Sequence, residues 1–263
     1  NAKPLRVTAN FEQATLACTG DLIALSDQDD LWMPERLERM VAQFDSRPEL
    51  TLLHSDARLV DGDGKPLGAS LTEAIGFSNW ERERIHHGGA LDVLLRRNVV
   101  TGATTMFRRN LLDSATPFPT EWVHDEWLAM VAAITGRVDF LPAALTDYRQ
   151  HEANQIGAAK PTLSDKVSRV REPRTERNRR LLARATVLDE RVPGLAGEGA
   201  HRDSPSTVLL VRRKLAHERF RSGLSSVRVF RLLPILWHAA SGAYRRFGRA
   251  RYDILRDLLQ RDS

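Results

Sequence analysis

In the amino-terminal half of the chain, short apolar runs alternate with stretches whose apolar residues recur at helical spacing. The run at residues 22–26 lies between Gly20-Asp21 and a group of acids, which predicts a buried strand. Residues 34–44 carry apolar positions at i, i+3, i+4 and i+7, which predicts a helix. A second buried strand is predicted at residues 50–60. This strand–helix–strand order predicts an α/β fold with a mostly parallel sheet.

Glycine and proline divide the next segment into further elements. The Asp-Gly-Asp-Gly sequence at 61–64 has the chemistry of a hairpin turn. Gly102 and Ala103 interrupt a predicted strand, which indicates the close approach of a ligand or of another backbone. Pro142 is expected to separate two short strands. We predict helices at 11–18, 90–97, 125–135 and from 108 onward, strands at 99–107, 138–141 and 145–149, and a loop at 68–79.

The carboxy-terminal part of the chain has a helical and strongly charged pattern. We predict three parts: an α/β domain at 1–158, an Arg-rich helix and linker at 159–205, and a basic amphipathic helical appendage at 206–263. The linker is placed at 193–199, where proline and glycine recur. The longest apolar run is far shorter than the roughly 18 residues of a membrane span.

Composition and charge support this division. The 263 residues are 42% hydrophobic and 28% charged, as is ordinary for a globular protein with a core. A single cysteine, Cys18, excludes a disulfide framework and a multi-cysteine metal site. The net charge of +5 combines 15 basic and 23 acidic residues in 1–159 with 24 basic and 11 acidic residues in 160–263. The two parts are therefore expected to meet different partners, the basic one a polyanion.

An acidic cluster follows the first predicted strand. Asp27 and Asp29 lie two residues apart, so in extended backbone their side chains point the same way, with Asp30 beside them. Mutual repulsion of such carboxylates is relieved by a hard divalent cation such as Mg²⁺ or Mn²⁺. The alternative interpretation is a solvated turn that caps the next helix. The motif alone leaves both interpretations open.

Two later motifs carry candidate chemistry. Asp125 and Glu126 stand at the start of an apolar helix, where they are either capping residues or a general base. Arg149 and His151 follow the last predicted strand and combine a guanidinium suited to phosphate with an imidazole. The alternative for that pair is an exposed polar loop.

The order of these motifs resembles family 2 glycosyltransferases, in particular the bacterial rhamnosyltransferase-like branch that builds surface polysaccharide. The resemblance covers about residues 8–158 and rests on four spaced motifs, found in this order. They are Ser-Asp-Gln-Asp-Asp-Leu-Trp, Gly-Ala-Thr-Thr-Met-Phe-Arg-Arg, His-Asp-Glu-Trp and Tyr-Arg-Gln-His-Glu-x-Asn.

That resemblance implies a GT-A fold and transfer of a sugar, with inversion, from a nucleotide-diphosphate donor to a hydroxyl, using Mg²⁺ or Mn²⁺. The expected acceptor is a saccharide or a lipid-linked saccharide of the bacterial cell envelope. By resemblance, Asp29 with Asp27 would hold the metal, and Asp125, or less readily Glu126, would be the base. Donor contacts would come from Asp27, Asp30, Arg149 and His151, and acceptor contacts from Gly102, Ala103 and Trp127.

One departure from the family is expected to matter. The strands that carry a Thr-Tyr-Asn-like motif and an Asp-Asp-Gly-Ser motif in the family have no counterpart here. Residues 1–158 therefore resemble the C-terminal part of a GT-A domain without its first nucleotide-binding strands. The alternative function is a non-catalytic fragment or a module that binds sugar or a partner. A nucleotidyl- or phosphotransferase is disfavoured because neither a Gly-rich phosphate loop nor a Walker-type lysine is present.

The basic carboxy-terminal helices leave two interpretations open. An amphipathic segment followed by Arg245, Arg246, Arg249 and Arg251 suits peripheral contact with an anionic membrane, at the inner face of the plasma membrane of a cytoplasmic protein. A solvated helical pair packed on the main domain is the alternative. Nucleic acid is not an expected partner, because aromatic residues are not interleaved with the arginines.

Overall fold

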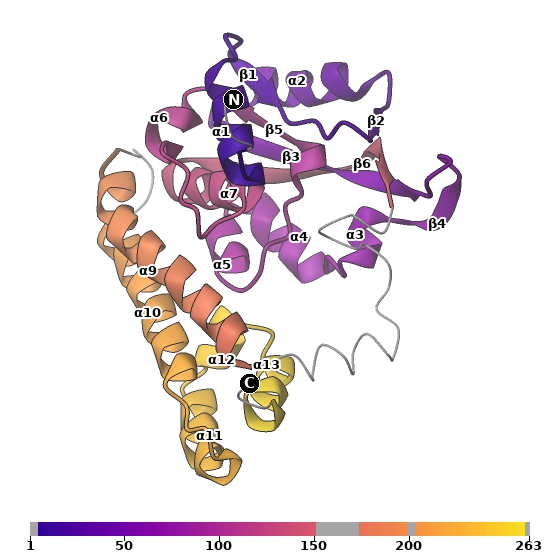
Figure 1. The fold of residues 1–263 in the computed structure, drawn as a ribbon. Coiled ribbons are helices and arrows are strands. Elements are labelled where there is room, and N and C mark those ends of the chain that lie inside the picture. The colour runs from indigo at the N-terminus through magenta and orange to yellow at the C-terminus, as the bar shows by residue number, and fades with distance from the viewer. Residues whose placement is uncertain (1–4, 151–173, 199–203, 261–263) are drawn as a thin grey trace. The chain divides into compact units, whose positions relative to one another are not determined.

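The structure is a computed structural model that describes residues 5–150, 174–198 and 204–260 (Figure 1). The chain divides into two compact units, one of Asn1–Val93 with Val99–Lys160 and one of Leu94–Asn98 with Pro161–Ser263. The first unit combines a sheet with helices, and the second is helical. The predicted α/β fold with a helical carboxy-terminal part is confirmed.

The sheet of the first unit has the strand order β1-β5-β3-β6-β2, with β4 paired to β3. Its longest members are β3 and β6, which run side by side and form the centre of the sheet. The strands are β1 (Leu22–Ala24), β2 (Leu31–Trp32), β3 (Leu50–Val60), β4 (Pro66–Ser70), β5 (Thr105–Arg108) and β6 (Arg137–Arg149).

The sheet is mixed, which corrects the expectation of a mostly parallel one. Only β3 and β6 pair in parallel, whereas β1–β5, β5–β3, β3–β4 and β2–β6 are antiparallel among the described strands. Because β5 is antiparallel to both of its neighbours, β1, β3 and β6 still share one direction. The alternation of strands and helices predicted these three co-directed strands. It carried no signal that β5 would run between β1 and β3 in the opposite direction.

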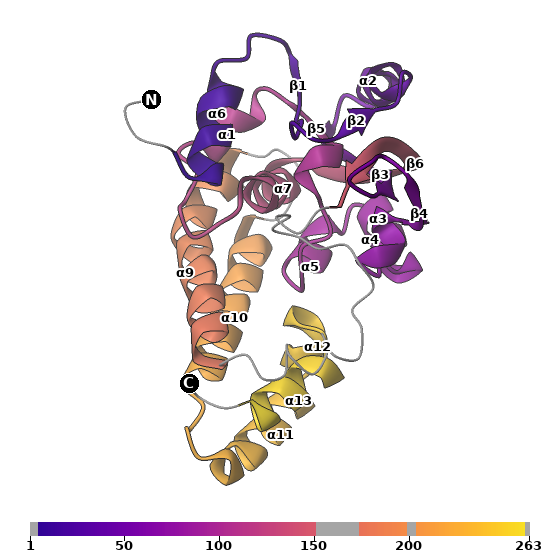
Figure 2. The ribbon, with the colours of Figure 1, turned by 45° about the vertical axis from the view of Figure 1, so that its right-hand side comes forward.

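Helices cover both faces of the sheet, as Figures 1 and 2 show. On one face, Met40 and Phe44 of α2 (Arg36–Ser46) pack against Leu50, Leu53 and Leu145 of the central strands. On the other face lie α4 (Asn79–His86) and α7 (His124–Thr135). The remaining helices of this unit are α1 (Val7–Leu16), α3 (Leu71–Ala74), α5 (Ala90–Leu94), the 3₁₀ turn η1 (Gly102–Thr104) and α6 (Leu111–Ala115).

Two local expectations are wrong. The strand β6 runs through Pro142 without a break, because its register against β3 shifts between Ser55–Leu141 and Asp56–Ala144 and accommodates the proline in an irregular step. The segment at 68–79 is not a loop but holds the end of β4, all of α3 and the start of α4. Both helices begin with a capping box, made by Ser70 with Glu73 and by Ser78 with Glu81.

The second unit is built from α9 (Arg174–Glu198) and α10 (Ser204–Ser222), which lie side by side in Figures 1 and 2, and from shorter helices. Pro193 lies inside α9, so the expected linker at 193–199 is helical as far as Glu198. The shorter elements are η2 (Arg228–Arg231), α11 (Leu232–Ala240), α12 (Ala243–Phe247) and α13 (Arg251–Leu259). Among the described residues, no helix is both long enough and apolar enough to cross a membrane.

Candidate active site

The acidic cluster lies on the turn that follows β1. The backbone N–H of Leu25 still donates to the Thr105 carbonyl (3.0 Å), after which the chain leaves the sheet. Asp27, Asp29 and Asp30 are half-buried, and the turn includes Asp29. The side-chain directions expected from an extended backbone therefore do not apply here. The cluster is arranged by a turn held between β1 and β2.

Arg149, at the end of β6, ties this turn to the sheet. Its backbone N–H donates to Oδ1 of Asp30 (2.9 Å), and its Nε donates to the carbonyl oxygen of Asp29 (2.9 Å). Its Nη1 also donates to the carbonyl oxygen of Gly62. Residues that are about 120 positions apart in the sequence are thereby joined. Arg149 thus orients the acidic turn with its backbone and its guanidinium.

Arg36 fixes the turn from the other side. Its fully buried guanidinium donates to the carbonyl oxygens of Ala103 (2.6 Å) and Leu25 (3.3 Å), and it lies 4.3 Å from the ring centre of Trp32. This cation therefore connects the end of β1, the η1 turn and β2. A buried guanidinium with several acceptors is held in one place, so the backbone around the acidic cluster is held with it.

Asp125 occupies the first turn of α7 and is 3% exposed. Its Oδ2 accepts a hydrogen bond from the backbone N–H of Gly102 (2.8 Å), and its Oδ1 accepts one from the N–H of Glu126 (2.7 Å). Any Cβ at position 102 would lie 3.0 Å from Nε2 of His124 and 3.6 Å from Oδ2 of Asp125. Glycine at 102 therefore allows the backbone to approach this carboxylate closely.

Asp125 and the acids of the turn affect one another electrostatically. Burial raises the pKa of Asp27, and the negative charges of Asp29 and Asp125 raise it further. Burial is also the main reason why the pKa of Asp30 is raised to about 6, with contributions from Asp27 and Asp29. The backbone N–H of Arg149 and the Arg36 cation oppose that rise. We call Asp27, Asp29, Asp30 and Asp125 the carboxylate cluster.

Two residues near this cluster had no role assigned from the sequence. The pKa of Tyr148 is raised by burial and then by the four acids of the carboxylate cluster. His124 is 6% exposed, is stacked 3.7 Å from Phe11, and has a pKa lowered by burial to about 4. Neither ring nitrogen of His124 has a hydrogen-bond partner among the described residues. Both residues belong to motifs that the sequence had singled out.

The other predicted site residues have different surroundings. Trp127 is fully buried, and its Nε1 donates to the carbonyl oxygen of Ala115 (2.7 Å), so it packs in the core. Gly102 and Ala103 lie in the buried η1 turn, and Glu126 is half-buried beside Asp125. His151 lies outside the described residues.

The donor set suits a hard divalent cation, although it does not form a complete metal site. Among the described residues, no group of three or more His, Cys, Asp or Glu side chains is placed to hold a metal ion by itself. The charges of Asp29 and Asp125 raise the pKa of Asp27, and those of Asp27 and Asp29 raise the pKa of Asp30, as acids do when their charge is not fully neutralised. Mg²⁺ commonly takes only one or two protein carboxylates and completes its shell with substrate phosphates. The cluster fits that pattern of binding.

Comparison with known proteins relates this site to sugar transfer. Residues 1–115 match the family described as Glycosyl transferase family 2, which supports the resemblance seen in the motifs at the level of the family. An uncharacterized protein of Mycobacterium tuberculosis is 30% identical over 147 residues, which are 55% of this chain and 39% of that protein. An uncharacterized glycosyltransferase of Nostoc is 25% identical over 165 residues, 60% of this chain and 48% of that protein.

The chain thus spans less than half the length of the curated relatives that it matches. Among solved structures, a mannosyltransferase from Pyrobaculum calidifontis in complex with GDP-mannose and Mn²⁺ aligns with a TM-score of 0.42 and 17% identity. That alignment covers 96% of this chain and 63% of the mannosyltransferase.

Proposed function

We propose that residues 1–158 supply the metal-binding and catalytic carboxylates of an inverting glycosyltransferase. One observation carries the proposal: the η1 turn joins Asp125 to the acidic turn. The N–H of Gly102 donates to Asp125 (2.8 Å), and the carbonyl of the adjacent Ala103 accepts from Arg36, which also holds the Leu25 carbonyl just before the acidic turn. The family match of residues 1–115 includes the acidic turn and supports sugar transfer as the reaction class. Asp125 lies beyond that match, so its role rests on the site itself and on the motif resemblance.

Asp125 is assigned as the general base. The N–H groups of Gly102 and Glu126 hold one carboxylate oxygen each, so the side chain has a fixed orientation. Asp125 takes the proton of the acceptor hydroxyl as that oxygen bonds to the anomeric carbon of the donor sugar. The bond from that carbon to the nucleoside diphosphate breaks at the same time, and its electron pair leaves with the diphosphate.

The acidic turn is assigned to the diphosphate end of the donor. Asp29, with Asp27, would hold a Mg²⁺ or Mn²⁺ ion, which neutralises the charge of the departing diphosphate. Asp30 positions the turn, since it is bonded to the backbone of Arg149. The Arg149 guanidinium is occupied by two carbonyl oxygens, so its first task is to orient Asp29, and contact with the donor is a second one.

The finer assignments rest on the motif resemblance alone. They are a nucleotide-diphosphate donor such as an activated rhamnose, a saccharide or lipid-linked acceptor, and a role in bacterial surface polysaccharide synthesis. A GT-A-like arrangement of the first unit is also part of this proposal. Trp127 is not proposed as an acceptor contact, because its side chain is fully buried.

Replacing Asp125 tests the assigned base. Asp125→Asn keeps an oxygen for the Gly102 N–H but removes the proton acceptor, so turnover should fall by roughly 10²–10⁴-fold. The measurement is the release of nucleoside diphosphate from a panel of nucleotide sugars, together with calorimetric binding of the donor, which should persist. Asp113→Asn replaces an exposed acid of α6; it is the matched control and should leave turnover unchanged.

Unchanged turnover in Asp125→Asn would rule out this residue as the base. Donor binding by the unaltered protein without any turnover would instead favour a module that binds the sugar nucleotide and does not transfer it.

We also propose that the second unit contacts an anionic membrane through an apolar patch formed by Val229, Phe230, Leu233, Leu236 and Trp237. These side chains are 52–78% exposed and recur at helical spacing along η2 and α11, whereas Ile235 on the opposite side is fully buried. An apolar group of this size on a surface marks an interaction site. This apolar patch is continuous, whereas the apolar residues of an ordinary protein surface are scattered.

Charge identifies an anionic lipid surface as the partner. Residues 219–252 contain eight arginines and no acidic residue, and Arg228, Arg245, Arg246 and Arg249 are exposed. Aromatic and leucine side chains that enter the headgroup region, next to arginines that meet anionic lipids, are the parts of an interfacial helix. With nine residues, α11 is suited to lie in the interface.

Vesicle sedimentation tests this contact. The protein should sediment with vesicles that contain phosphatidylglycerol and not with phosphatidylcholine vesicles, and the double variant Leu233→Ser, Trp237→Ser should lose most of this binding. Trp80→Ser replaces an exposed tryptophan of the first unit and should retain this binding. Equal binding of both variants, or a dimer in solution that the double variant dissociates, would contradict a lipid partner.

A further inference from the structure

His124, the first residue of α7, has a buried imidazole without a polar partner. The residue is 6% exposed, and neither Nδ1 nor Nε2 has a hydrogen-bond partner among the described residues. Buried polar groups of folded proteins are nearly always hydrogen-bonded, so a group of this kind needs an explanation. Within the described part of the chain, His124 is the only residue whose side chain has two such atoms.

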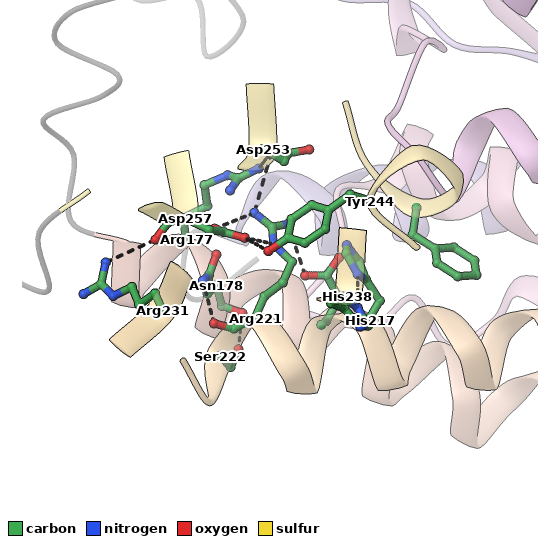
Figure 3. Close-up of polar contacts among 12 residues, drawn as sticks. Arg177, Asn178, His217, Arg221, Ser222, Arg231, His238, Tyr244, Asp253 and Asp257 are labelled. Atoms are coloured by element: carbon green, nitrogen blue, oxygen red, sulfur yellow. Dashed lines mark hydrogen bonds and ion pairs between the residues drawn. The ribbon is translucent and has the colours of Figure 1, made fainter. Parts of the chain in front are cut away.

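Two other buried histidines differ from His124 in this respect. At His217 of the second unit, Nδ1 lies 2.9 Å from Nε2 of His238, and the two rings are stacked (Figure 3). Only Nε2 of His217, and likewise only Nε2 of His54, is buried without a partner among the described side chains. Burial of a histidine in this protein therefore does not by itself explain why both nitrogens of His124 are unpaired.

The ring of His124 is held in place by an aromatic neighbour. It stacks face to face on Phe11 of α1, with 3.7 Å between the ring centres and 6° between the ring planes. Hydrogen bonds of an imidazole lie in the plane of the ring, and Phe11 covers only one face of that plane. The stacking therefore orients the ring and leaves the edge with the two nitrogens able to bind a ligand.

Gly102 shows where one part of that edge lies. A Cβ at position 102 would be 3.0 Å from Nε2 of His124 and 3.6 Å from Oδ2 of Asp125. Both atoms therefore border the same side of Gly102. The same oxygen of Asp125 accepts the hydrogen bond from the Gly102 N–H (2.8 Å). The imidazole is thus a close neighbour of the carboxylate that is assigned as the general base.

Burial also determines the charge of this imidazole. It lowers the pKa of His124 to about 4, so the ring is neutral near neutral pH. A neutral imidazole has one N–H donor and one nitrogen acceptor. A hydroxyl group likewise combines a donor with an acceptor, whereas an ionised phosphate offers acceptors and pairs best with cations. The chemistry of His124 therefore matches a ligand rich in hydroxyl groups better than an anionic ligand.

We propose that His124 is a specificity-determining residue that binds a hydroxyl group of an acceptor sugar. The inference rests on the proposed function, because the base Asp125 defines where the acceptor lies. Nε2, on the side of Gly102, is assigned to a hydroxyl next to the one that Asp125 deprotonates. This contact orients the acceptor toward the anomeric carbon of the donor. It favours a saccharide over an acceptor that has a single isolated hydroxyl.

Two substitutions separate this role from a structural one. His124→Phe keeps an aromatic ring on Phe11 and removes both nitrogens. Because an unpaired buried polar group destabilises a fold, this change should not lower the urea concentration at which the chain unfolds. His124→Gln keeps a donor and an acceptor close to the position of Nε2. It serves as the conservative variant and also covers the case in which phenylalanine is too large for the site.

Kinetics with simple acceptors tests the proposal on the full chain. Release of nucleoside diphosphate is measured from a panel of nucleotide sugars, in water alone and with methyl hexopyranosides. In His124→Phe the KM for the glycoside should rise about tenfold or more, whereas release in water and the KM for the donor should change by less than about threefold. His124→Gln should recover most of the glycoside affinity. His87→Phe, which replaces an exposed histidine, should behave like the unaltered chain.

Deoxy glycosides identify the hydroxyl that His124 binds. One monodeoxy methyl glycoside should be as weak an acceptor for the unaltered chain as its parent is for His124→Phe. The same substitution should not weaken that deoxy glycoside further, because the hydrogen bond is already missing. Additive losses for every deoxy glycoside would contradict a direct contact and would overturn the proposal.

NMR of the full chain with ¹⁵N-labelled histidine tests the contact without turnover. A methyl glycoside should shift the ring-nitrogen signals that the His124 variants lack, and it should leave those of His87 in place. Such a shift without any transfer by the unaltered chain would support the sugar contact and contradict the proposed reaction. No shift with any glycoside, or transfer with a glycoside KM that both His124 variants leave unchanged, would overturn the inference. The second result would leave the proposed reaction standing.

Discussion

At the scale of single residues, the carboxylate cluster shows which side chains a sequence can place together. Asp27, Asp29 and Asp125 follow from motifs in a known order, and the structure brings their charges to one region. The roles of Tyr148 and Arg36 could not be predicted, because they depend on contacts between residues far apart in the sequence. Trp127 lies on a helix that is buried on nearly all sides, so its position in the sequence could not tell a core residue from a binding residue.

A buried histidine makes the stability of the first unit depend on pH. His54 on β3 is 2% exposed, packs against the rings of Phe77 and Phe140, and has a pKa lowered by burial to about 4. A histidine whose pKa is lower in the folded state binds fewer protons there than in the unfolded chain. Stability is therefore lost as the pH falls from about 6.5 toward 4, by about 2 kcal/mol between pH 7 and pH 5 for this residue.

His54→Phe should remove that contribution to the acid sensitivity. The difference between the free energies of unfolding at pH 7 and pH 5, measured by urea titration, should become smaller in this variant. His87→Gln, which replaces an exposed histidine, serves as the control. A pH dependence that is the same in His54→Phe and in the unaltered chain would refute the burial argument.

At the scale of elements, the periodicity of apolar residues predicted helices and strands well. Proline and glycine residues predicted the ends of these elements less well. The apolar stripe of α2 and the apolar sequence of α7 gave helices close to the observed bounds, and β3 was expected as a strand over 50–60. Pro142 and Pro193 were both expected to end an element, and both lie inside one. Packing of β6 and α9 against neighbouring elements outweighs the preference of each proline to end a strand or a helix.

The capping boxes of α3 and α4 were present in the sequence as Ser70-x-x-Glu73 and Ser78-x-x-Glu81 and could have located both helices. The direction of β5 could not have been predicted in this way. An apolar run predicts that a strand is buried. It does not predict the direction of the strand, because this depends on the path of the chain between strands.

The contact between α7 and β3 depends on a glycine. A Cβ at Gly136 would overlap Oγ1 of Thr51, so in Gly136→Ala the threonine side chain or one of the two elements has to shift. We expect a loss of about 1–3 kcal/mol of unfolding free energy. Gly62→Ala, where nothing lies within 4 Å of the added carbon, should be close to neutral.

Thr51→Ala should relieve this clash when it is combined with Gly136→Ala. A double-mutant cycle in urea unfolding should then give a favourable coupling of about 1 kcal/mol or more. Additive effects of the two substitutions would show that the cost at position 136 arises elsewhere.

At the scale of the whole molecule, the two units differ in charge as they differ in fold. The acidic balance of residues 1–159 matches a site that concentrates carboxylates, and the basic balance of residues 160–263 matches a helical unit rich in arginine. The change in charge near residue 160 was visible in the sequence.

The most direct test of the central claim is calorimetric titration of UDP, GDP and dTDP into the chain, with Mn²⁺ and with EDTA. If the acidic turn holds the metal and the donor diphosphate, one of these nucleotides should bind more tightly with Mn²⁺ than with EDTA. Asp29→Ala should abolish this gain, and Asp45→Asn, an exposed acid on α2, should preserve it. The same affinity with Mn²⁺ and with EDTA, or no nucleotide binding by a folded chain, would contradict a donor site built on the carboxylate cluster.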